Sequence, residues 1–64
     1  MREAARIGRM LALIAKIWYK NQDMRLGQMI YNLCRPNEDI FNVEDDKMEE
    51  RLKKVDAGGF DSLS

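Results

Sequence analysis

The hydrophobic pattern of the first twenty residues is that of an amphipathic helix. Apolar side chains recur three and four positions apart from Ile7 through Ile14 to Trp18, with alanines between them. Basic side chains follow the other side at the same helical spacing, namely Arg2, Arg6, Arg9, Lys16 and Lys20. The pattern therefore predicts a helix over about residues 3–20 with a basic side and an apolar face, in which Trp18 is a core anchor.

A second helix is predicted over about residues 24–34, and we expect the other helices to pack against it. Its apolar stripe has the spacing i, i+3, i+4 and i+7, formed by Leu26, Met29, Ile30 and Leu33. A polar edge lies beside that stripe, formed by Arg25, Gln28 and Asn32. Gly27 is unfavourable inside a helix by about 1 kcal/mol relative to alanine, so we expect another helix to cross close to it.

The remainder of the chain predicts a third helix over about residues 43–55, with Asn42 as its N-cap and Gly58 beyond its end. Its apolar seam is narrow and consists of Met48, Leu52 and Val55. Before it, residues 40–41 are Ile-Phe in a polar stretch, which suggests a plug over the open end of the helices. The expected fold is thus a small all-α three-helix domain over residues 1–56, followed by a loose tail over 57–64.

Length and composition limit the architecture further. A chain of 64 residues with 45% hydrophobic residues forms one domain with a marginal core. A single cysteine excludes an internal disulfide and fits a reducing, cytoplasmic compartment. Because so short a chain has a marginal core and no disulfide to stabilise it, we expect a homodimer or a protein partner to complete the core. No apolar run approaches the roughly 20 residues of a membrane span, and the N-terminus lacks the order of a signal peptide.

The charges are divided unevenly along the chain. Residues 1–35 carry seven basic and two acidic residues, a net charge of +5, whereas residues 36–64 carry four basic and nine acidic residues, a net charge of −5. Two interpretations remain open. The halves attract each other within one chain or across a dimer, or the basic face is kept for a partner.

Catalytic chemistry finds little support. The chain has no histidine, and its one cysteine, Cys34, is predicted at the end of a helix, so no Ser–His or Cys–His pair is available. Neighbouring carboxylates such as Asp45 and Asp46 point about 100° apart on a helix and do not converge on a metal ion. No glycine-rich phosphate loop follows a strand. We expect no enzyme activity, no catalytic or metal-binding residues and no cofactor.

The order of several motifs resembles a family of short uncharacterised bacterial and bacteriophage proteins. The motifs are a first helix ending in Trp18, a central Arg-Leu-Gly-Gln-Met-Ile-x-Asn segment at 25–32, and Asp-Ile-Phe at 39–41 followed by Glu-Asp-Asp at 44–46. The resemblance covers about residues 6–55. Asn21-Gln22 replaces an Asn-Pro that is common in the family, and Asn42 replaces an aromatic residue. The resemblance implies a phage or prophage setting and no particular activity.

The favoured function is a small protein-interaction module that binds, and in a phage setting modulates, a host protein. The predicted partner-binding residues are the polar edge of the second helix and the basic side of the first, namely Arg6, Arg9, Lys16, Arg25, Gln28 and Asn32. The alternative is a small helix-turn-helix-like nucleic-acid-binding regulator. A structural interpretation also stays open, in which Gln28 and Asn32 are buried and tie the 35–42 loop to the second helix.

Overall fold

A computed structural model describes residues 3–63 and confirms the predicted all-α three-helix domain. The elements in chain order are α1 (Ala5–Lys20), α2 (Leu26–Asn32), the 3-10 helix η1 (Ile40–Asn42), α3 (Asp45–Gly58) and the 3-10 helix η2 (Phe60–Leu63). The described residues contain no strand. The predicted basic residue Arg2 lies outside the described part of the chain.

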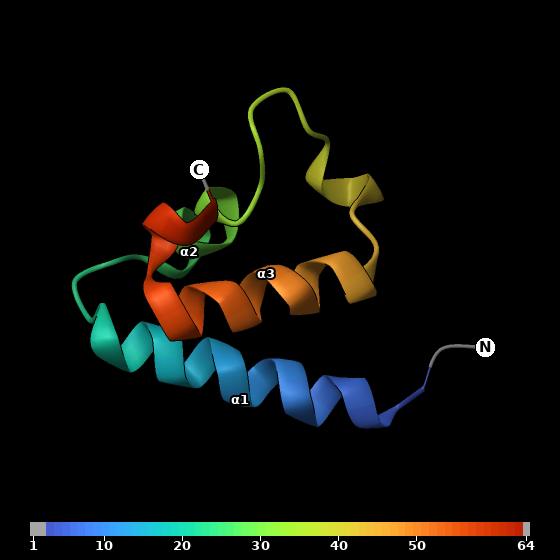
Figure 1. Ribbon diagram of the computed structural model, residues 1–64, viewed down its shortest axis with the longest axis horizontal. Coiled ribbons are helices and arrows are strands. Elements are labelled where there is room, and N and C mark those ends of the chain that lie inside the picture. Colours follow the sequence, from blue (N-terminus) through green and yellow to red (C-terminus); the bar gives the residue numbers. More distant parts are fainter. Residues whose placement is uncertain (1–2, 64) are drawn as a thin grey trace.

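The two long helices lie side by side and run in the same direction (Figure 1). Their register is visible in two ion pairs, because Arg6 contacts Asp45 near the start of both helices and Lys20 contacts Asp56 near their ends. This parallel arrangement requires the chain to travel back between the two helices. The short helix α2 and the long loop after it make that return, and the loop projects away from the helix pair (Figure 1).

The core is small and draws on all three α-helices. Five side chains are buried: Ile17 of α1, Met29 of α2, Leu33 directly after α2, and Leu52 and Val55 of α3. All five were predicted to lie on apolar stripes. Other apolar residues of the same stripes are less covered by neighbouring side chains, because α2 has only two turns. Leu26 is 46% exposed, and Trp18 is 37% exposed and donates its indole N–H to the Met24 carbonyl oxygen at 2.8 Å instead of entering the core.

The ends of α2 and α3 differ from the prediction. Arg25 is extended, and its backbone N–H donates to Oε1 of Gln28 at 2.9 Å, so α2 begins only at Leu26. The N-cap of α3 is Glu44, while Asn42 belongs to η1; the prediction of Asn42 as N-cap was wrong. The prediction that Gly58 lies beyond the third helix was also wrong, because α3 includes Gly58 and the residue after it with a positive φ, of 78°, is Gly59.

Three further expectations are corrected. The plug at residues 40–41 was wrong, because Ile40 is 47% and Phe41 90% exposed. No helix crosses close to Gly27, since a Cβ atom placed there would have no heavy atom within 4 Å. The predicted loose tail instead forms η2, from which Phe60 and Leu63 pack against the core. Two apolar side chains from this segment thus add to the cover of the core.

Candidate interaction surface

The basic side of α1 is tied to the acidic side of α3. Nε of Arg6 lies 2.6 Å from Asp45, Nε of Arg9 lies 2.7 Å from Glu49, and Nζ of Lys20 lies 3.3 Å from Asp56. The Arg9 guanidinium lowers the pKa of Glu49 through their hydrogen bond. These contacts favour attraction between the two halves of one chain over a basic face kept for a partner. Among the predicted basic residues of α1, Lys16 has no ion pair within the described part of the chain.

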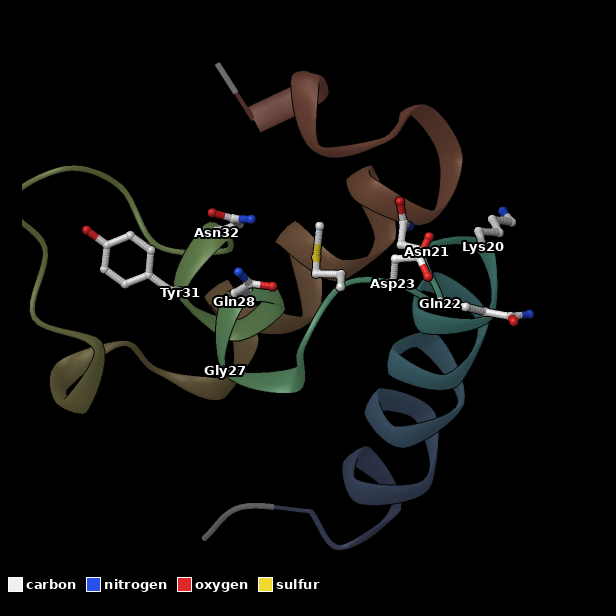
Figure 2. A pocket seen from close by; sticks show the side chains of 9 residues that line it. Lys20, Asn21, Gln22, Asp23, Gly27, Gln28, Tyr31 and Asn32 are labelled. Atoms are coloured by element: carbon white, nitrogen blue, oxygen red, sulfur yellow. The ribbon is translucent and has the colours of Figure 1, made fainter.

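The polar edge of α2 lies partly on a shallow concavity at the turn from α1 to α2. The concavity has a volume of about 840 Å³. Gln28 and Asn32 line it from α2, and Asn21 and Asp23 of the turn face them from the other side (Figure 2). Both predicted residues are exposed, and so is Arg25, which does not line this concavity. The lining is rich in amide groups, which can both donate and accept hydrogen bonds.

The structural interpretation of Gln28 and Asn32 was wrong. Neither side chain is buried, and the side-chain oxygen of Gln28 caps its own helix. The loop is tied to the core from α3 instead, by Arg51. Nη1 of Arg51 donates to the Leu33 carbonyl oxygen at 3.0 Å, and its two terminal nitrogens bind the two carboxylate oxygens of Glu38 at 2.6 and 2.7 Å.

This arginine clamp changes the acidity of the loop carboxylate. The hydrogen bonds from Arg51, together with one from the backbone N–H of Arg35, lower the pKa of Glu38 to about 2. At neutral pH both partners are charged, so the loop is held by a fork-shaped ion pair. The segment that leads to η1 is therefore anchored to the middle of α3.

The element η1 presents an aromatic side chain to solvent. The Asp39 carboxylate accepts hydrogen bonds from the backbone N–H of Phe41 and from the side-chain amide of Asn42, both at 3.0 Å. These bonds close a single helical turn without help from the core. Phe41 is consequently fixed at its base by the backbone while its ring remains 90% exposed.

A second concavity of about 710 Å³ lies between α2 and the loop that carries η1. Its apolar lining includes Leu26, Ile30, Pro36 and Ile40. Tyr31 lines both concavities and is 77% exposed. Figure 2 shows its ring pointing away from the amide-lined side. Tyr31 and Ile40 line this concavity, and Phe41 follows Ile40 in η1 without lining it. We call these three residues, with the apolar concavity between α2 and η1, the aromatic surface.

The aromatic surface was not identified from the sequence. The prediction gave Ile40 and Phe41 to the core and did not use Tyr31. One sequence signal was available, because Tyr31 follows Gln28 by three positions and so lies next to the polar edge of α2 rather than on its apolar stripe. For Phe41 no such signal existed, since its exposure results from the local turn made by Asp39.

Cys34 is half-buried after α2, and its thiol donates to the Ile30 carbonyl oxygen at 3.7 Å. Burial raises the pKa of this thiol, so it is protonated at neutral pH. Among residues 3–63 there is no group of three or more acidic or cysteine side chains arranged to hold a metal ion, and no helix is long and apolar enough to cross a membrane.

Comparisons of the chain with models of protein families, with curated proteins and with solved structures gave no match.

Proposed function

We propose that this chain is a non-enzymatic protein-interaction module of a phage or prophage type, which binds a host protein through the aromatic surface. The observation that carries the proposal is Phe41, which is 90% exposed on a backbone held by Asp39 and by the Arg51–Glu38 clamp. A rigidly placed aromatic side chain loses little conformational entropy on binding and fills a pocket in a partner.

Two features of the neighbourhood support a protein partner. The apolar concavity beside Ile40 offers a place for an apolar side chain of the partner. Tyr31 adds a hydroxyl group at the edge of an apolar contact, and aromatic residues are enriched in protein interfaces. Asn32 lines both concavities, and Gln28 lines the amide-lined one, so they supply polar groups at the rim. The pairing of Arg6 and Arg9 with α3 leaves fewer unpaired cations on α1 for the phosphate groups of a nucleic acid.

The test is affinity capture of the tagged chain from a host lysate, divided into nuclease-treated and untreated halves. Phe41→Ala is compared with Tyr19→Ala, since Tyr19 is a matched aromatic residue on α1 that is 76% exposed. We expect one protein that survives nuclease, is retained by Tyr19→Ala and binds Phe41→Ala about tenfold or more weakly.

Two results would contradict the proposal. Equal capture by the wild-type chain and Phe41→Ala would remove the aromatic surface from the interaction. A set of partners that disappears with nuclease would favour the nucleic-acid-binding alternative. Both variants should keep the wild-type melting temperature, because exposed substitutions away from caps and ion pairs change stability by no more than about 0.5 kcal/mol.

A further inference from the structure

Helix α1 has an apolar face that the other described elements leave largely uncovered. Three large side chains on it are partly or largely exposed: Ile7 by 54%, Leu11 by 59% and Trp18 by 37%. Small exposed residues complete the face, which we call the outer face and which comprises Ala4, Ile7, Gly8, Leu11, Ala15 and Trp18. Their spacing of three and four positions keeps them on one side of a helix about 24 Å long.

The outer face carries no charge. On a helical wheel Arg9, Lys16 and Lys20 lie on the other side of α1, where Arg9 and Lys20 contact α3. A partner can therefore cover the outer face without removing a charged group from water, and a second copy would meet no like charge there.

The order of large and small residues along the outer face indicates which partner covers it and in which orientation. If two α1 helices cross antiparallel with Leu11 against Leu11, the two other large residues each lie level with a small residue of the other copy. Trp18 lies level with Ala4, and Ile7 with Ala15. A parallel pair would instead place Trp18 against Trp18 and leave gaps between the alanines. We propose that two copies of this chain associate antiparallel through their outer faces.

The glycine in α1 agrees with this arrangement. Gly8 lies inside the helix, where glycine is unfavourable relative to alanine. A Cβ atom at this position would have no heavy atom within 4 Å in the single chain, so nothing in the monomer accounts for it. Gly8 lies on the outer face, where the absence of a side chain lets the backbone of a second helix approach closely. The arrangement is symmetric, since each contact occurs twice around the two-fold axis at Leu11.

A single helix-to-helix contact is at the small end of specific interfaces, so we expect a reversible dimer that dissociates on dilution. Sedimentation velocity over a wide concentration range measures it. Trp18, the only tryptophan, reports the same event, because its fluorescence emission should shift to shorter wavelength as the dimer forms.

Leu11→Lys is the decisive variant, with Leu26→Lys as its matched control. Leu26 is a leucine of similar exposure, 46%, on α2 and away from the outer face. We expect Leu11→Lys to weaken the dimer by about tenfold or more and Leu26→Lys to leave it unchanged. Far-UV circular dichroism confirms that both variants remain helical. A wild-type chain that stays monomeric at millimolar concentration overturns the proposal, and so does equal weakening by the two variants.

The orientation has its own test. A nitroxide attached to Ala4→Cys, in a Cys34→Ser background, should quench Trp18 only in the antiparallel dimer, because positions 4 and 18 of one helix are about 21 Å apart. Quenching that grows with concentration supports the arrangement; dimerisation without quenching overturns it. This inference does not depend on the aromatic surface, so loss of a host partner on Phe41→Ala leaves it untouched.

Discussion

The same substitution at two isoleucines of α1 measures how strongly this small core depends on its few buried side chains. Ile17 is 1% exposed and Ile7 is 54% exposed, and both belong to one helix. Replacing either residue by valine keeps a β-branched side chain, so the change in helix propensity is closely matched. The two variants therefore differ mainly in the burial of one methylene group.

The expected cost follows from that burial. Removing a buried methylene loses about 0.8 kcal/mol of transfer free energy, and the residual cavity brings an Ile→Val change in a core to about 0.5–1.5 kcal/mol. For Ile7→Val we expect roughly half of the transfer cost and no cavity. In a domain of this size 1 kcal/mol corresponds to about 4–8 °C in melting temperature.

Urea denaturation followed by far-UV circular dichroism measures both variants. The protein is kept at the lowest workable concentration, so that any association through the outer face is absent. Equal or larger destabilisation by Ile7→Val under these conditions would refute the placement of α1, because the outer face would then be as buried as the core. A cost of Ile7→Val that appears only at high concentration would instead support the dimer.

Two other predictions follow from the loop clamp and from the glycines. The pKa of Glu38 lies near 2, below the ordinary value of 4.5, so its stabilisation is present in full above pH 4.5 and is lost as the pH falls toward 2. The wild type should therefore have a higher melting temperature than Glu38→Gln at pH 7, and the two melting temperatures should converge near pH 2. A difference that grows as the pH falls would contradict the clamp. Gly59→Ala should destabilise the chain by about 1 kcal/mol or more, because φ is 78° at this position. The control Gly27→Ala should stabilise it by about 0.5–1 kcal/mol in chemical denaturation, since the helix gains an alanine in open space. A stabilising Gly59→Ala together with a destabilising Gly27→Ala would contradict the ends of α2 and α3 given above.

The sequence by itself determined the helical class and the apolar stripes from which the core is drawn. Periodicity follows from local geometry, because each residue advances about 100° around a helix, so the stripes that contain Ile17, Met29 and Leu52 could be identified without knowledge of their neighbours. The polar edge of α2 was identified for the same reason, and Gln28 and Asn32 are exposed as that edge requires. The unequal division of charge left two interpretations open, and the contact between Arg9 and Glu49 favours attraction between the two halves of one chain.

Only the tertiary structure decided which apolar residues are covered. Leu11 and Ile17 are equally hydrophobic by pattern, yet α2 and α3 are too small to surround α1, so one of them is exposed and the other buried. Phe41 and Phe60 show the same limit, since hydrophobicity alone cannot tell which ring reaches the core. The carboxylate of Asp39 closes a turn that keeps Phe41 outside, whereas the turn at Gly59 brings Phe60 back onto α3. Burial depends on residues far apart in the chain, and periodicity contains no information about them.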